Sequence, residues 1–139
     1  MNIESRHTNH IRGRILGIDY GSKRIGVAVS DEARKFALPL SVVHTSDLAI
    51  KEIQEIARQH EVKEIVMGES RNYKQEPNPI FEESVEFKGQ LEKLGFTVYL
   101  ELEFMTSMQA ERFQGKNDMS DASAAALILQ SYLDRDKVE

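Results

Sequence analysis

The chain has 139 residues, a formal net charge of −5 and no cysteine. This length suits one domain with a buried core, and the missing cysteines exclude a disulfide framework, a thiol nucleophile and Cys-ligated zinc. The acidic balance argues against a high-affinity, non-specific nucleic-acid binder, whose domains are usually basic, but it is compatible with a nuclease whose metal-binding carboxylates contribute to that charge.

No membrane-spanning or targeting segment is predicted. The chain has no run of about eighteen apolar residues, and its N-terminus has no apolar signal core. Residues 1–12 are polar and lack periodicity, so we expect a flexible tail before a single domain over 13–139. His7 and His10 would need a helix to share a metal ion, and no helix is predicted there. We expect a cytoplasmic protein without membrane contact.

Residues 15–32 predict a β-hairpin. An apolar run ends at Asp19, a short polar turn breaks it, and a second apolar strand starts at Ile25. Alternation puts the Asp19 side chain on the face of Ile15 and Gly17, and the glycine leaves room above that face. A carboxylate there needs a cation or hydrogen-bond donors. The alternative is an Asp that only stabilises the turn.

Three elements are expected after the hairpin. Residues 36–44 predict a third strand, which its proline restricts to a sheet edge or a bulge. Ser46 and Asp47 offer an N-cap to a helix that ends near Gln59. Residues 62–68 predict a fourth strand, and the strand-helix-strand order favours a right-handed crossover that makes it parallel to the first strand.

The second half of the chain predicts three helices and a fifth strand. One helix begins at Pro79 and ends at Gly95, the strand covers residues 96–103, and a short helix over 110–113 follows a capping box. The apolar stripe of the first helix is Ile80, Phe87, Leu91 and Leu94. The last helix is capped by Asp118, Ser120 and Asp121. Its inward positions are Ala122, Ala125, Ala126, Leu129 and Leu133.

This element order predicts an α/β fold. The chain reads β-β-β-α-β-α-β-α-α, which indicates a five-stranded mixed sheet: a three-stranded antiparallel meander followed by parallel strands, flanked by helices.

Carboxylates converge at one edge of the predicted sheet. The first, fourth and fifth strands end on the same side, where crevice sites form. Asp19, Glu69 and Glu103 stand at or just past these ends, and Asp121 opens the helix that packs back across the edge. Such oxygen ligands suit one or two Mg²⁺ or Mn²⁺ ions in phosphodiester hydrolysis. Taken singly, each acid also fits an exposed strand end, a loop or a first helical turn.

The segment Gly-Ile-Asp-Tyr-Gly-Ser-Lys-Arg-Ile-Gly-Val-Ala-Val-Ser-Asp at 17–31 resembles the opening of the YqgF family of Holliday junction resolvases and pre-16S rRNA nucleases. The resemblance extends over residues 13–135 and implies an RNase H-like fold. The acidic positions of that family follow the first strand, follow the fifth strand and open the last helix. They match Asp19, Glu103 and Asp121, so the resemblance implies that these are the catalytic, metal-binding residues.

Two motifs depart from the family pattern. After the fifth strand the family has Asp-Glu-Arg, whereas this chain has Leu-Glu-Phe at 102–104, which removes an acid and a guanidinium that could pair with phosphate. After the fourth strand the family has Gly-Leu-Pro-x-Asn, and this chain has Gly-Glu-Ser-Arg-Asn at 68–72. Glu69 lies near a carboxylate position of RuvC-type resolvases, which makes it a further candidate metal ligand. The other interpretation is drift after activity was lost.

The resemblance implies a metal-dependent nuclease that acts on structured RNA or branched DNA. Processing of the 5′ end of pre-16S rRNA is expected ahead of Holliday junction resolution, with Lys23 or Arg24 contacting phosphate and Asn72 in an accessory role, in a monomer or a homodimer. The altered motif at 102–104 and the acidic balance favour an alternative, an inactive module that binds RNA or a ribosome-assembly partner. A third possibility is a structural or oligomerising domain that binds neither metal nor nucleic acid.

Overall fold

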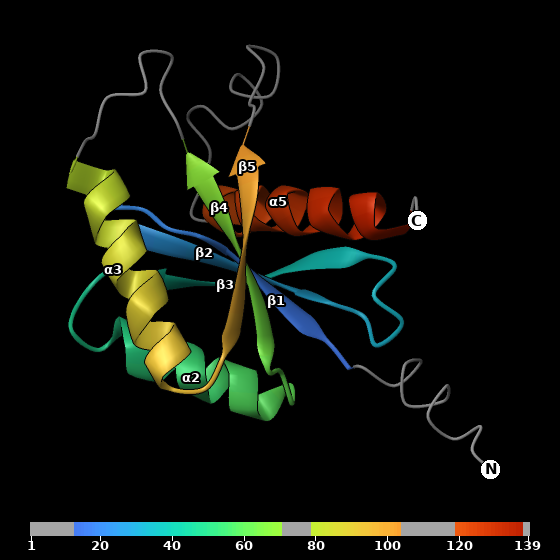
Figure 1. Cartoon of the computed structure of the whole chain (residues 1–139), viewed down its shortest axis with the longest axis horizontal. Helices are drawn as coiled ribbons and strands as arrows, with labels where there is room; N and C mark the ends of the chain where they lie inside the picture. Colours follow the sequence, from blue (N-terminus) through green and yellow to red (C-terminus); the bar gives the residue numbers. More distant parts are fainter. Residues whose placement is uncertain (1–12, 71–78, 104–118, 138–139) are drawn as a thin grey trace.

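The computed structural model describes residues 13–70, 79–103 and 119–137 (Figure 1). Within these ranges the chain forms five strands and three helices. The strands are β1 (Ile15–Asp19), β2 (Arg24–Ser30), β3 (Ala37–His44), β4 (Glu64–Ser70) and β5 (Thr97–Glu103). The helices are α2 (Ala49–Gln59), α3 (Pro79–Lys93) and α5 (Met119–Lys137). None of these helices is both long enough and apolar enough to span a membrane.

The strands form one mixed sheet in the order β3-β2-β1-β4-β5. β2 pairs antiparallel with both β1 and β3, whereas β4 pairs parallel with both β1 and β5. The predicted α/β fold, with a three-stranded antiparallel meander followed by parallel strands, is therefore confirmed.

Helices cover both faces of the sheet (Figure 1). α2 and α3 pack on one face, where Ile53 and Leu91 join Ile18 and Met67 in a buried cluster. α5 covers the other face. Its buried cluster comprises Ile15, Ala28, Val66, Ala125, Ala126, Ile128, Leu129 and Leu133. Because successive side chains of a strand point to opposite faces, each central strand contributes to both clusters.

α5 approaches the sheet most closely at two glycines. A Cβ at Gly17 would lie 2.7 Å from the Cβ of Leu129, and a Cβ at Gly26 would lie 1.9 Å from the carbonyl oxygen of Asp121. Side chains cannot pack at these distances, so glycine is required for α5 to rest on β1 and β2. The room that the sequence predicts above Gly17 is consequently filled by α5.

The predicted edge strand is confirmed in position and irregularity. β3 lies at the edge of the sheet, and its register with β2 shifts between Val27 and Ala28, next to Pro39. A β-bulge and an edge position both remove the need for a proline N–H in the ladder.

The predicted N-cap of α2 is wrong, and two of the three cap residues predicted for α5 lie inside the helix. Leu48 is the N-cap of α2 and no side chain bonds there; the Ser46 hydroxyl instead accepts the Leu48 N–H at 3.1 Å. α5 begins at Met119, which places Ser120 and Asp121 inside its first turn. The expected inward residues of α5 are all buried. Asp118 and the short helix predicted over 110–113 lie outside the described residues.

The apolar stripe predicted for α3 is confirmed only in part. Phe87 and Leu91 are buried, whereas Leu94 is 44% exposed. α3 ends at Lys93, so Leu94 no longer follows the helical periodicity, and Gly95 adopts a positive φ of 106° that terminates the helix. The side chain of Ile80 is outside the described part of the chain.

We predict that Gly26→Ala lowers the free energy of unfolding by about 3 kcal/mol or more, because the new methyl group would collide with the α5 backbone. The matched control is Gly89→Ala in α3, where a Cβ meets nothing within 4 Å. That substitution should stabilise the helix by about 0.5–1 kcal/mol. Chemical denaturation of both variants measures the difference. Equal stability of Gly26→Ala and wild type would contradict the close packing of α5.

Candidate functional site

The carboxyl ends of β1, β4 and β5 meet at one edge of the sheet (Figure 1). Asp19 is the last residue of β1, and Ile18 beside it is in register with Met67 of β4. Glu69 and Glu103 occupy backbone positions in the last two residues of β4 and β5. The predicted convergence of the three strand ends is confirmed for the backbone, whereas the side chains of Glu69 and Glu103 are outside the described part of the chain.

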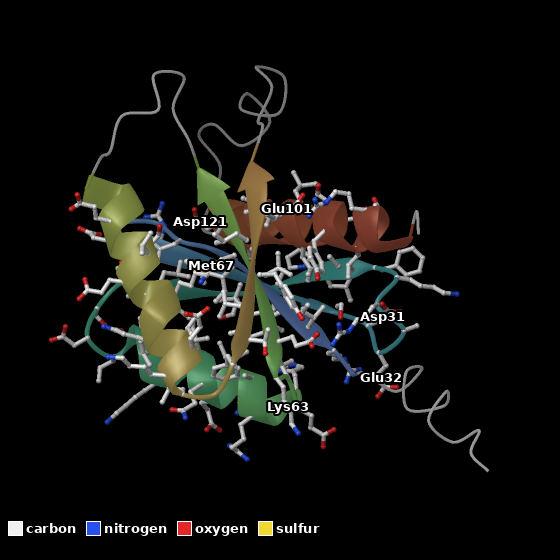
Figure 2. All side chains as sticks on the ribbon, in the orientation of Figure 1. Asp31, Glu32, Lys63, Met67, Glu101 and Asp121 are labelled. Carbon is white, nitrogen blue, oxygen red and sulfur yellow. The ribbon has the colours of Figure 1, made fainter. Side chains whose placement is uncertain are left out.

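Asp19 and Asp121 are brought together through Gly26. Asp19 is the register partner of Gly26 in the β1–β2 pair, and the carbonyl oxygen of Asp121 rests on the same glycine. Figure 2 shows Asp121 at the end of α5 that lies near the carboxyl end of β4. The first turn of α5 therefore places the backbone of Asp121 near that of Asp19, although 102 positions separate the two residues in the sequence.

Arg24 forms an ion pair with Asp121. Its Nε donates to Asp121 Oδ2 at 2.7 Å, and the two side chains are 47% and 27% exposed. Arg24 starts β2 two positions before Gly26, so alternation places both on the face that α5 covers. The sequence identifies both charged residues as site candidates but gives no sign of their pairing, because 97 positions separate them.

Lys23 stands exposed in the turn before β2. This turn is tied to the end of β3: Thr45 N–H donates to the Lys23 carbonyl at 3.0 Å, and the Thr45 hydroxyl donates to the Gly21 carbonyl at 2.7 Å. The turn backbone is therefore held in place while the Lys23 amine faces solvent. Asn72, the third residue expected to bind nucleic acid, lies outside the described residues.

An acidic groove of about 310 Å³ lies on the α2 and α3 side and is lined in part by Tyr20, the residue after Asp19. Tyr20 and Phe87 form its aromatic floor, with ring centroids 5.0 Å apart. Burial raises the pKa of the Tyr20 hydroxyl, and the neighbouring carboxylates of Glu83 and Glu86 raise it further. The remaining lining residues are Ser46, Asp47, Ile50 and Gln90. Sequence reasoning missed this groove because it depends on the packing of α2 against α3.

Glu101 has a structural role that its position alone did not reveal. It is 5% exposed, accepts a hydrogen bond from the Ser131 hydroxyl at 2.8 Å and forms an ion pair with Arg135. Figure 2 shows Glu101 where β5 passes α5. These contacts fix α5 to β5, an edge strand of the sheet.

The carboxylate groups among the described site residues are chemically suited to bind a divalent cation. Asp19 and Asp121 supply carboxylate oxygens, the ligands that Mg²⁺ and Mn²⁺ prefer, although one Asp121 oxygen is paired with the Arg24 guanidinium. Across residues 13–70, 79–103 and 119–137, no group of three or more Asp, Glu or His side chains is arranged so that it could hold a metal ion. The described residues thus provide two carboxylates, and the third expected ligand, Glu103, falls at the limit of the described backbone.

Comparisons with known proteins place this chain in a family. Residues 13–135 match RuvX, described as a Holliday junction resolvase family. A protein of Caldanaerobacter subterraneus subsp. tengcongensis named "Putative pre-16S rRNA nuclease" is 36% identical over 136 residues, covering 89% of this chain and 98% of its own length. A Streptococcus pyogenes protein of the same name is 32% identical, with 88% and 98% coverage.

A solved structure supports the fold assignment. Thermus thermophilus RuvC in complex with a Holliday junction substrate aligns with a TM-score of 0.57 at 17% identity, covering 89% of this chain and 96% of that chain. The RNase H-like fold and the resemblance to the YqgF family are therefore both confirmed.

We predict that Tyr20 titrates above its ordinary value of 10.0, because burial and then Glu83 and Glu86 raise its pKa. The unfolded chain then releases this proton first, so the stability contributed by Tyr20 is complete below pH 10.0 and declines as the pH rises further. Phenolate absorbance, compared between wild type and Tyr20→Phe, isolates this titration. Glu83→Gln should lower the Tyr20 pKa, and an unchanged titration curve in that variant would contradict the contact.

Proposed function

The chain belongs to the RuvX Holliday junction resolvase family, and from this premise we propose that it hydrolyses phosphodiester bonds in structured nucleic acid with one or two Mg²⁺ or Mn²⁺ ions. The observation that carries the proposal is the meeting of Asp19 and Asp121 at Gly26. The backbone positions of these two acids meet at one glycine, so a divalent cation bound there would offset negative charge from both side chains.

We assign Asp19, Asp121 and Glu103 as the metal-binding set. Glu103 is the last residue of β5, which ends beside β4 at the same end of the sheet as Asp19. These residues would hold the metal ions, which would supply activation of a water molecule and stabilisation of the leaving oxygen of the phosphodiester. The contribution of the chain is to hold three carboxylates from two strands and one helix in fixed relative positions.

We propose a different role for Glu69, outside the metal-binding set. Its backbone is in register with Leu102, and it follows by two positions Met67, whose side chain lies in the α2 and α3 cluster. We therefore propose that Glu69 is accessory and does not replace a member of the metal-binding set. This makes Glu69 a suitable control for the three carboxylates.

The charges around the edge favour one approach for the substrate. Lys23 and Arg24 lie on the β1–β2 side of Asp19, whereas Asp47, Glu83 and Glu86 line the groove on the α2 and α3 side. A polyanion is attracted to the first side and repelled by the second. We propose that the substrate backbone passes over the β1–β2 turn, where Lys23 contacts phosphate.

We propose pre-16S rRNA as the preferred substrate class. The relatives that match nearly their whole length at 32–36% identity carry that substrate in their names, whereas the RuvC structure bound to a Holliday junction shares only 17% identity and supports the fold alone. We therefore propose processing of the 5′ end of pre-16S rRNA as the first function, with the Holliday junction as the second substrate class.

One sequence feature favours a second candidate function. The Leu-Glu-Phe at 102–104 lacks the acid and the guanidinium of the family motif, and the chain carries a net charge of −5. A module that keeps the fold, binds RNA or a ribosome-assembly partner and does not cleave would tolerate both. Cleavage assays separate this alternative from the nuclease.

We predict that Asp19→Asn reduces Mn²⁺-dependent cleavage by at least about 100-fold, because it keeps the side-chain shape but removes a metal-binding charge. The assay uses labelled RNA that spans the 5′ processing site of pre-16S rRNA and a four-way DNA junction. Glu69→Gln removes one charge at the same sheet edge and should leave most activity intact. Equal loss in both variants would contradict the assigned set, and a correctly folded wild type that cuts neither substrate would favour the non-catalytic module.

We predict that Lys23→Gln weakens RNA binding across sequences and lowers the slope of log Kd against log salt by about one, as expected for one lost phosphate contact. Lys63→Gln is the control, because Lys63 is exposed just before β4, at the opposite end of the strand from the candidate site (Figure 2). Fluorescence anisotropy over a salt series measures both slopes. An identical effect of the two substitutions would indicate only a general charge effect and would contradict the proposed substrate path.

A further inference from the structure

The Arg24–Asp121 ion pair joins the two groups that the proposed function would otherwise use separately. Arg24 Nε lies 2.7 Å from Asp121 Oδ2, which is hydrogen-bond distance for a charge-assisted pair. The same carboxylate is assigned to a divalent cation, and the same guanidinium is expected from the sequence to contact phosphate. The Asp121 oxygen that accepts the Arg24 N–H cannot accept a metal ion in the same position.

The pairing is imposed by the backbone. Gly26 receives the carbonyl oxygen of Asp121, which fixes the first turn of α5 on β2. Arg24 lies two positions before Gly26 on the same strand and is in register with His44 of β3. Both side chains therefore start from backbone positions set by a sheet and a helix packed together, so the pair can open only by side-chain movement.

Stability is a weak reason for this ion pair. The Arg24 side chain is 47% exposed, and ion pairs between exposed side chains contribute little to the free energy of unfolding. Neutralisation of the carboxylates is a stronger reason, because Asp19 and Asp121 both meet at Gly26 and each adds a negative charge to the same small region. A positive side chain reduces their repulsion.

We propose that Arg24 is an internal counter-ion that holds Asp121 in the metal-free protein and yields this carboxylate to the divalent cation. The inference rests on the metal site of the proposed function. Arg24 is a positioning residue here: it acts through Asp121, and its charge opposes cation binding until the side chain moves. The half-exposed guanidinium then turns toward the side of Lys23, where the substrate phosphate is proposed to pass.

The first test is Mn²⁺ binding to the purified full chain, measured by calorimetry and by electron paramagnetic resonance without nucleic acid. Arg24→Gln should tighten Mn²⁺ binding by about tenfold, because one unit charge next to a divalent ion is removed. Arg24→Lys keeps the charge and should restore a Kd close to wild type. Lys23→Gln removes the same charge from the neighbouring exposed side chain and should tighten binding much less.

The second test follows the wild type alone and does not depend on the folding of a variant. Titration with Mg²⁺ should shift the NMR resonance of the Arg24 Nε–H as its hydrogen bond to Asp121 is lost. An Arg24 resonance that stays unchanged at saturating Mg²⁺, or an Arg24→Gln variant with unchanged or weaker Mn²⁺ binding, would overturn the inference.

The outcomes also separate this inference from the proposed function. If wild type binds Mn²⁺ and Asp19→Asn does not, but Arg24→Gln fails to tighten binding, the metal site stands and the role of Arg24 is wrong. If neither wild type nor Arg24→Gln binds Mn²⁺, both are wrong. Binding by Arg24→Gln alone would support the counter-ion role in its strongest form.

Discussion

The contact between the α5 backbone and Gly26 is the constraint on which the rest of the site depends. Because position 26 has no side chain, the carbonyl oxygen of Asp121 can rest on β2, and the first turn of α5 is placed beside the end of β1. The ion pair between Arg24 and Asp121 follows from that placement. At the far side of the helix the buried Glu101, bonded to Ser131, prevents α5 from sliding along the sheet. A helix fixed at both ends can hold a carboxylate in one position.

The two faces of the sheet differ in the side chains that they carry. The face covered by α2 and α3 carries the larger apolar cluster, whereas Gly17 and Gly26 lie under α5 beside the ion pair of Arg24 and Asp121. The two glycines let α5 lie close to the sheet. This close approach brings the Arg24 and Asp121 side chains within hydrogen-bond distance. The same division gives the edge its asymmetry of charge, with Lys23 on one side of Asp19 and the carboxylates beside Tyr20 on the other.

Local patterns of the sequence predict the elements and their order, but not the contacts that α5 makes with the sheet. The hairpin, the edge position of β3 and the parallel crossover each follow from periodicity and proline chemistry within a few residues. Asp19 and Asp121 can also be named as candidate site residues, from their positions at a strand end and in the first turn of a helix. The Arg24–Asp121 pair spans 97 positions and depends on α5 packing, and the burial of Glu101 depends on Ser131 in that same helix. The cap at Leu48 and the exposure of Leu94 differ from prediction because the helices start or stop within a turn of the expected residue.

The most direct measurement of the proposed site is anomalous diffraction from crystals of the chain soaked in Mn²⁺. The proposed site predicts an anomalous peak at the carboxyl edge of the sheet, bonded to carboxylate oxygens of Asp19, Asp121 and Glu103, with the Arg24 side chain turned away from Asp121 and the Gly26 contact preserved. A peak bonded to Glu69 in place of Asp19, or no ordered Mn²⁺ at this edge while Arg24 still holds Asp121, would contradict it.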